Sequence, residues 1–345
     1  MAFPKRSGVA RSLFSAIGLA LVLWLLPGRA PVTPVERYHL SMGTLVKLVL
    51  YVGEDAANPA SQSAVTELAV IDSLMSSYSA TSETSLIGAD AGEAVFVASA
   101  AVAEVIERSI YFSRLTRGAF DPTVGALTQL WNFPDAVMPP GQASIDSALT
   151  HVDYDELELN GNRVFLRRHG MQLDLGAAVK GFAVDRAVAA LEQVGVDAGL
   201  VEAGGDLRFW GRKPDGEPWL FGVRHPRIPD CTVISSDVGL SSVATSGDYE
   251  QTFEFEQVKY HHILDPATGR PARSTVSATA WATTALDADI LSTALFVLGP
   301  KEGIKLVEGL DEVEALMFYD NAGHLEYVYS AGLSGSLQFP DCARN

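Results

Sequence analysis

Apolar positions along the chain recur with two periods, and each period predicts one type of element. Residues three and four apart face one side of a helix, as Val65, Leu68 and Met75 do, whereas alternation is typical of strands. The helical period predicts helices at residues 59–75, 99–115, 176–194, 285–298 and 301–310, with a brief one ending at residue 131. Alternating or β-branched runs predict strands at residues 45–52, 157–159, 164–166, 219–224, 275–284, 313–319 and 326–329, and a further pair of strands within residues 233–243.

Turn residues separate several of these strands. Asn160-Gly161 is typical of a tight hairpin turn, and residues 251–264 alternate around a turn near Glu256-Gln257. Thr245 to Asp248 is interpreted as a polar chain reversal, and Gly204-Gly205 as a strand break where another group approaches the backbone closely. Because runs of strands are interrupted by runs of helices, the pattern predicts an α+β fold with antiparallel pairing.

The composition describes a globular protein with a large core. Of 345 residues, 48% are hydrophobic and 19% are charged. The formal charge is −17, and it becomes −21 without residues 1–30, which carry four basic residues and no acid. Such an acidic body repels nucleic acid and anionic lipid, so neither is expected as its partner, and an anionic substrate would need a cation at its site.

The first thirty residues predict a targeting segment that is not part of the folded domain. Lys5, Arg6 and Arg11 precede an apolar run from Leu13 to Leu26, and small residues follow up to Ala30. This order is typical of an export signal, with a short membrane anchor as the alternative. Basic residues before the run place the body on the outer side. We therefore expect an exported protein whose residues 31–40 form a linker.

Cys231 and Cys342 are the only cysteines. Two residues so far apart form neither a metal-ligand pattern nor a redox motif. In an oxidising compartment they could form a disulfide, and the sequence leaves their pairing open.

An imidazole pair and a carboxylate stand at the end of the hairpin predicted at residues 251–264. His261-His262 is followed by Asp265, and Pro266 stops the strand. Strand ends present functional groups, although a packed histidine and an ordinary turn aspartate are the structural alternative. Because neighbours on a strand point to opposite faces, only one of the two histidines can face a site.

Three oxygen-bearing residues share one face of the helix predicted at residues 285–298. Asp289, Ser292 and Thr293 are spaced i, i+3 and i+4. Short oxygen ligands on one face suit a hard cation such as Mg²⁺, which takes few protein ligands. The structural alternative is an aspartate that complements the helix dipole, beside hydroxyls bonded to the preceding turn.

A second candidate site is the strand-to-helix junction from Asp174 to Gly181. Free N–H groups at a helix N-terminus bind anions, small residues let a ligand approach, and Lys180 adds positive charge. The spacing of a P-loop is absent. A capped helix start is the alternative here, as it is for Asp121-Pro122-Thr123.

Eight short motifs follow one another in order between about residues 40 and 310. They are Met42-Gly43-Thr44, Met75 to Tyr78 with Ser82 to Ser85, Gly118 to Gly125, Asp174 to Arg186, Gly204-Gly205-Asp206, Thr245 to Tyr249, His262 to Pro266, and Ala288 to Ala294. In this order they resemble the ApbE family of FAD:protein FMN transferases, which are exported or membrane-anchored bacterial flavin-handling enzymes. Eight motifs in register are far more specific than any one of them.

The resemblance implies a two-lobed, T-fold-like α+β domain over residues 41–335, with antiparallel sheets, a flavin cleft between the lobes, and a tail over residues 336–345. It also implies Mg²⁺-dependent cleavage of FAD. FMN would join a Thr or Ser hydroxyl of an acceptor flavoprotein, such as a subunit of a membrane redox complex, and AMP would leave. The implied location is the periplasmic side of the bacterial inner membrane, with the N-terminus kept as an anchor or cleaved near Ala30.

Site roles are implied residue by residue by the same resemblance. His262 is implied as the general base, with Asp265 as the other catalytic candidate, and we expect its basic form to be lost near the ordinary pKa of about 6.5. The metal ligands would be Asp289, Ser292 and Thr293 with the carbonyl of Ala177. Some members carry an acid at position 292, and many carry glycine at position 177. Flavin contacts are implied at Met42, Tyr78, Ala119, Phe120, Asp121, Asp174, Lys180 and Ile263.

Three functions therefore remain open. The first is the transferase. The second is a Mg²⁺-dependent FAD pyrophosphatase, in which water replaces the acceptor hydroxyl. The third is a non-catalytic exported flavin-binding protein, which the Asp289–Thr293 face and His262 argue against because a pure binder needs no metal.

Overall fold

An eight-stranded sheet organises the protein in this computed structural model, which describes residues 33–133, 135–236 and 238–343. Every neighbouring pair in the sheet is antiparallel. In spatial order its strands are β1 (Val35–Ser41), β2 (Thr44–Leu50), β6 (Gly199–Ala203), β7 (Asp206–Trp210), β10 (Ser242–Gly247), β15 (Ser277–Ala282), β16 (Glu314–Asn321) and β17 (His324–Tyr329). The α+β class with antiparallel sheets is confirmed.

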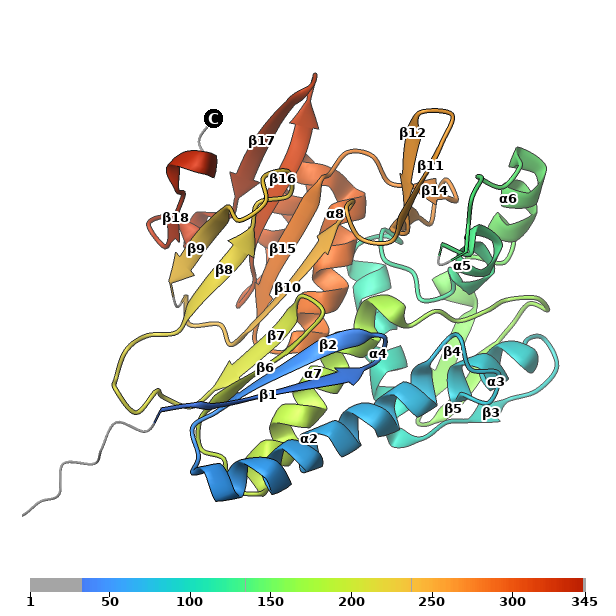
Figure 1. Ribbon diagram of the computed structural model, residues 1–345. Coiled ribbons are helices and arrows are strands. Elements are labelled where there is room, and N and C mark those ends of the chain that lie inside the picture. The colour runs from blue at the N-terminus through green and yellow to red at the C-terminus, as the bar shows by residue number, and fades with distance from the viewer. Residues whose placement is uncertain (1–32, 134, 237, 344–345) are drawn as a thin grey trace, which may run out of the picture. The chain divides into compact units, whose positions relative to one another are not determined.

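Helices cover one face of this sheet (Figure 1). They are α2 (Glu54–Met75), α7 (Gly176–Gln193) and α8 (Ala285–Val307), with α4 (Ala100–Leu115) packed on α7 and α8. Successive side chains of β16 point to opposite faces of the sheet. Ala315 and Met317 pack in the core under the helices, whereas Leu316 and Phe318 pack in the core on the other face. Strand β15 is buried at all six positions, so it is the centre of the fold.

A small sheet covers part of the opposite face. It consists of β8 (Leu220–Arg224), β9 (Thr232–Ser236) and β18 (Leu337–Gln338), and its apolar side packs with Trp281 and Phe318. The residues expected to form a C-terminal tail are therefore partly structural, because β18 pairs with β9. Cys342 also forms a disulfide with Cys231, which answers the question that the sequence left open.

The remaining elements lie between α2 and α7 in the chain or follow β10. They are α3 (Glu83–Ala89), α5 (Gly125–Trp131), α6 (Gln142–Leu149), a sheet of β3 (Phe96–Val97), β5 (Arg163–Leu166) and β4 (Leu157–Asn160), and two hairpins, β11 (Thr252–Phe255) with β12 (Val258–His261) and β13 (Leu264–Asp265) with β14 (Arg270–Pro271). Trp131, Phe253 and Tyr260 share a small apolar cluster, which ties the first hairpin to α5.

Several sequence predictions were wrong in detail. The expected linker over residues 31–40 contains most of β1, which pairs with β2 across Met42-Gly43. Helix α2 begins at Glu54 and not at Pro59, because Ala57 and Ala60 already form its buried stripe. The short helices α3 and α6 were not predicted.

Two polar stretches also differ from their interpretation. Thr245, Ser246 and Gly247 are the last residues of β10, so the chain reverses only after them. Gly204 and Gly205 are the turn between β6 and β7, with φ of 61° and 98°. The side chain of Thr44 approaches Gly204 closely, and its Oγ1 lies 2.8 Å from the place of an added Cβ.

The export signal or anchor predicted over residues 1–30 lies outside the described residues. Within the part of the chain that the structure describes, no helix combines the length and the hydrophobicity needed to cross a membrane.

Candidate active site

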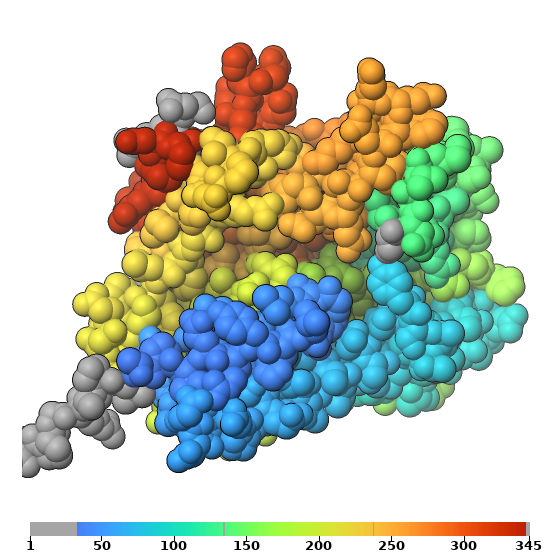
Figure 2. Space-filling view, viewed as in Figure 1, coloured from blue at the N-terminus to red at the C-terminus, as the bar shows by residue number. Residues whose placement is uncertain are grey.

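A recess opens on the face shown in Figure 2, between the blue N-terminal segments and the yellow and orange segments, with lime atoms on its floor. Lime marks the part of the chain that contains α7. The turn Met42-Gly43 and the end of β10 belong to the blue and orange segments, respectively. The predicted metal ligands, Lys180 and His262 also belong to the lime and orange parts of the chain.

The residues of the predicted metal face are largely buried. Asp289 and Ser292 are 3% and 1% exposed on α8. Ser246 at the end of β10 joins the set, because its Oγ lies 2.8 Å from Ser292 Oγ and 3.1 Å from Thr293 Oγ1. Sequence reasoning gave Ser246 no role, although it stands within the Thr245 to Tyr249 motif.

This donor set fits a hard cation better than a transition metal. Among the described residues, no three His, Cys, Asp or Glu side chains gather as metal ligands. With Ser246 included, the set offers one carboxylate and three hydroxyls. Mg²⁺ takes few protein ligands when substrate phosphates and water complete its shell. Ala177 has φ −92° and ψ 20° and departs from helical geometry at the start of α7, so its carbonyl is not held in a regular helical turn.

Lys180 connects two buried carboxylates. Its Nζ donates a hydrogen bond to Asp206 Oδ2, at the start of β7, and lies 3.6 Å from Asp289 Oδ1. Burial opposes the charge of Lys180, but Asp206 and Asp289 outweigh it and raise the lysine pKa. Burial, and then the charge of Asp289, raise the pKa of Asp206 to about 7. Lys180 therefore stays charged in the site.

Backbone contacts fix the metal face against α7. The N–H of Gly181 donates to Asp289 Oδ2 at 3.0 Å. One turn further along α7, the carboxylate of Asp185 accepts from the N–H groups of Ala285 and Leu286 and from Arg208. Asp185 thus caps α8 from a neighbouring helix. Asp185 belongs to the Asp174 to Arg186 motif, but the sequence did not indicate that it contacts the start of α8.

His262 is the histidine that remains available for chemistry. Its Nδ1 is buried and has no hydrogen-bond partner within the described residues. Burial lowers the pKa of His262 to about 4, with smaller contributions from His261 and from the positive charge of Lys180. The expectation of an ordinary pKa near 6.5 is therefore corrected, and the imidazole is neutral at pH 7.

The two neighbours of His262 have structural roles. His261 is buried, its Nε2 lies 2.7 Å from the carbonyl of Ala272, and its ring packs edge-on against Phe296. Asp265 was a catalytic candidate, but its oxygens accept from Ala267 N–H at 2.9 Å and from Thr268 Oγ1 at 3.0 Å. It therefore closes its own turn, as short polar residues commonly do.

Some residues predicted to contact the flavin are exposed to solvent, and others are buried. Tyr78 is 78% exposed on the loop after α2. Partial burial of its hydroxyl, and then the charge of Asp174, raise the pKa of Tyr78. Asp174 also caps α7 by accepting the N–H of Gly176 at 2.8 Å. Met42 stands in the β1–β2 turn with φ of 53°, and Ala119 is half-buried.

Phe120, Asp121 and Ile263 are buried. Phe120 and Ile263 both belong to the main core. Asp121 accepts from Thr123 N–H and Oγ1 at 2.8 and 2.6 Å and from Tyr154 N–H at 3.1 Å. Burial raises the pKa of Asp121 against these bonds. Its carboxylate organises the loop after α4.

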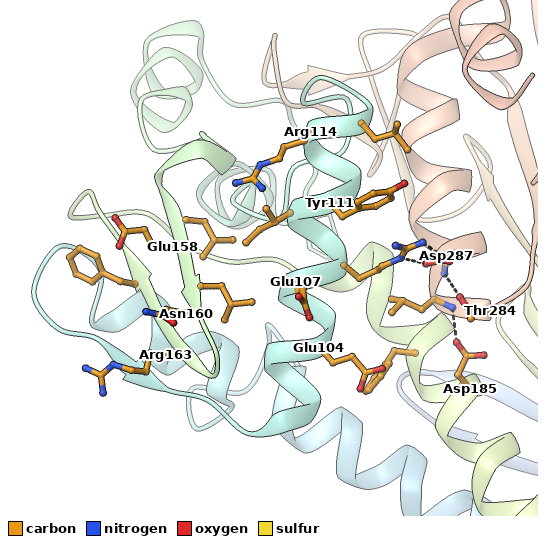
Figure 3. Close-up of a pocket in the computed structure, with 18 of the residues that line it drawn as sticks. Glu104, Glu107, Tyr111, Arg114, Glu158, Asn160, Arg163, Asp185, Thr284 and Asp287 are labelled. Carbon is orange, nitrogen blue, oxygen red and sulfur yellow. Dashed lines mark hydrogen bonds and ion pairs between the residues drawn. The ribbon is translucent and has the colours of Figure 1, made fainter. Parts of the chain in front are cut away.

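A groove of about 1650 Å³ lies elsewhere, between α4, the β4–β5 hairpin, α7 and the start of α8 (Figure 3). Asp185, Thr284 and Asp287 line it, but neither His262 nor the metal face does. The predicted site residues Asp289, Lys180 and His262 therefore lie outside this groove.

The sequence and the fold both match those of known proteins. The sequence model of the ApbE family matches residues 42–317. An FAD:protein FMN transferase of Treponema pallidum is 34% identical over 315 residues, which are 85% of this chain and 86% of that protein. One of Vibrio cholerae is 32% identical over 313 residues, covering 86% and 92%.

Solved structures agree with the sequence relatives. The ApbE protein of Thermotoga maritima has a TM-score of 0.80 and 32% identity, covering 88% of this chain and 99% of that one. The flavin transferase ApbE from Vibrio cholerae has a TM-score of 0.79 and 27% identity, with the same coverage. With most of its length matched by the family and by its structures, the chain belongs to the ApbE family.

Proposed function

We propose that the protein is a Mg²⁺-dependent FAD:protein FMN transferase. The observation that carries this proposal is the meeting of a buried oxygen face, formed by Asp289, Ser292 and Thr293, with the charged Lys180. His262 lies within electrostatic reach of that lysine. The name shared by the curated relatives supports the same reaction.

The chemistry is a transfer at phosphorus. An acceptor Thr or Ser oxygen forms a bond to the FMN phosphorus of FAD, the bond from that phosphorus to the bridging oxygen breaks, and AMP leaves with the bridging oxygen. A bound Mg²⁺ would neutralise charge on the pyrophosphate oxygens. Asp289, Ser292, Thr293 and the Ala177 carbonyl would hold it.

The protein's own groups supply the remaining functions. A hydroxyl is a poor nucleophile at neutral pH, so His262 is assigned to accept its proton, which the neutral imidazole can do. Lys180 adds the positive charge that a protein of net charge −17 needs to hold an anionic substrate. The exposed ring of Tyr78 offers a surface on which a flavin can stack.

Replacing Asp289→Asn tests this assignment. We expect at least a hundredfold loss of FMN transfer, measured as the mass gain of a Thr-containing acceptor and as AMP released, because the single carboxylate of the metal face is removed. Asp287→Asn is the matched control: it makes the same change on the same helix, at a residue paired with Arg108 in the groove of Figure 3.

The outcomes separate the three functions. FMN and AMP without mass gain on the acceptor would identify a pyrophosphatase, and FAD binding without either product would identify a flavin-binding protein. Full activity of Asp289→Asn would refute the metal assignment.

We also propose that the protein acts outside the cytoplasm, on the periplasmic side of the inner membrane. The basic and apolar order of residues 1–30 supports export. The Cys231–Cys342 disulfide supports an oxidising compartment, where such bonds persist. Fractionation of cells that express the full chain tests this location.

A further inference from the structure

Asp206 is a buried carboxylate that no step of the proposed reaction uses. It is the first residue of β7, directly after the Gly204-Gly205 turn, and its side chain is 2% exposed. Its carboxylate accepts a hydrogen bond from Lys180 on α7, and the lysine side chain is 31% exposed. A carboxylate buried to this extent needs a counter-ion, and Lys180 supplies it.

The ammonium is shared unequally between two carboxylates. It is hydrogen-bonded to Asp206, whereas Asp289 Oδ1 lies 3.6 Å away, beyond the distance of a good hydrogen bond. The other oxygen of Asp289 is held by the N–H of Gly181. The Asp289 oxygen that faces Lys180 is therefore close to a positive charge without being bonded to it.

We propose that Asp206 is a positioning residue, which holds the Lys180 ammonium off Asp289 so that Asp289 remains free to bind a divalent cation. This inference rests on the proposed role of Asp289 as metal ligand. It assigns Asp206 no contact with substrate or metal.

The flexibility of the lysine side chain explains why its ammonium needs an anchor such as Asp206. An ammonium on a flexible four-carbon stem carries three donors and moves readily to the nearest carboxylate. When Asp206 is replaced by a neutral residue, Asp289 is the remaining buried carboxylate beside Lys180. A direct ion pair between Lys180 and Asp289 would then compete with a cation for Asp289. Because Asp206 comes from the β6–β7 hairpin and Asp289 from α8, the two carboxylates hold the ammonium from separate elements.

Titration calorimetry with Mn²⁺ on the full chain, without FAD, tests the inference independently of turnover. We expect Asp206→Asn to weaken Mn²⁺ binding by roughly tenfold, since hydrogen bonds to charged groups are worth about that much. Asp206→Glu keeps the anchoring charge and should restore most of the affinity. Glu202→Gln is the matched control, because Glu202 also acts on Asp206 by its charge but bonds to Gly205 N–H.

A second background separates positioning from simple charge. In Lys180→Met the competing ammonium is gone, so adding Asp206→Asn should not weaken Mn²⁺ binding further. Lys180→Gln provides the same background if the methionine variant does not fold. An equal loss with and without Lys180 would show that Asp206 acts through its own charge, and an unchanged affinity of Asp206→Asn would overturn the inference. Wild-type protein that binds no Mn²⁺ would overturn it too, while FMN transfer by the same sample judges the proposed function separately.

Discussion

Among single residues, His262 shows most clearly how burial prepares a group for chemistry. Its imidazole is neutral at pH 7 because burial, His261 and Lys180 disfavour the charged form, and its Nδ1 has no partner in the described part of the chain. We expect His262→Ala to lower the rate of FMN transfer by roughly two to four orders of magnitude, the usual contribution of a general base. Single-turnover rates at saturating FAD would measure this loss.

The pH dependence follows from the same pKa. A base whose pKa is lowered to about 4 keeps its proton-accepting form until the pH falls toward that value. The acid limb of kcat/KM should therefore lie nearer pH 4 than pH 6.5. A limb at pH 6.5 that disappears in His262→Ala would show that the imidazole is not buried in the working enzyme. His261→Ala is the control, and it should lower the unfolding temperature more than the rate, because His261 packs against Phe296.

At the scale of elements, the contact of α7 with α8 places the metal face. A Cβ added to Gly181 would lie 2.1 Å from the carbonyl oxygen of Ala285 and 2.8 Å from Asp289 Cβ. Replacing a helical glycine with alanine normally stabilises a helix by about 0.5–1 kcal/mol. Here we expect Gly181→Ala to destabilise the protein by about 1–3 kcal/mol, because the two helices must separate.

Urea unfolding measures this change, and metal titration shows whether Asp289 moves with α8. Gly141→Ala is the control, because nothing lies within 4 Å of its added Cβ. A stabilised Gly181→Ala variant would contradict the close packing of the two helices.

The elements also show what the sequence could and could not predict. Helix α4 and the β4–β5 hairpin were predicted because strong local signals, the helical apolar period and the Asn160-Gly161 turn, agree with their tertiary setting. Helix α2 was started too late because its first turns bury only small alanines, which give a weak periodic signal. The Gly204-Gly205 pair was interpreted as a strand break, but the sequence did not show that it forms the tight turn between β6 and β7.

For the site, sequence order identified the segments but not their contacts. Asp289, Lys180 and His262 were found because each stands in a motif. The bonds of Ser246 to Ser292 and of Asp206 to Lys180 join residues 46 and 26 positions apart, and no local pattern reports such distances. The sequence also did not give the burial of the side chains, which lowers the pKa of His262 and places Phe120 in the main core.

At the scale of the whole molecule, one antiparallel sheet gathers these distant residues. Its inner strand β15 is buried on both faces, with α8 on one side and the core of Trp281 and Phe318 on the other. The candidate site lies on the α7–α8 side, whereas the small β8–β9–β18 sheet closes the opposite side. A change confined to the side of the small sheet should therefore spare the candidate site.

The Cys231–Cys342 disulfide allows that separation to be tested. It closes a loop of 111 residues that ends beside β18, and such a loop restricts the unfolded chain. Reduction, or Cys342→Ser, should lower the free energy of unfolding by about 2–4 kcal/mol, the typical contribution of a disulfide. FMN transfer at 25 °C should remain within about threefold of the wild type, because Cys231 belongs to the core opposite the site. Urea unfolding with and without a thiol reductant measures the first effect, and Cys231→Ser should show no further response to the reductant. Loss of FMN transfer at a temperature where the reduced protein is still folded would show that the two faces of the sheet are coupled.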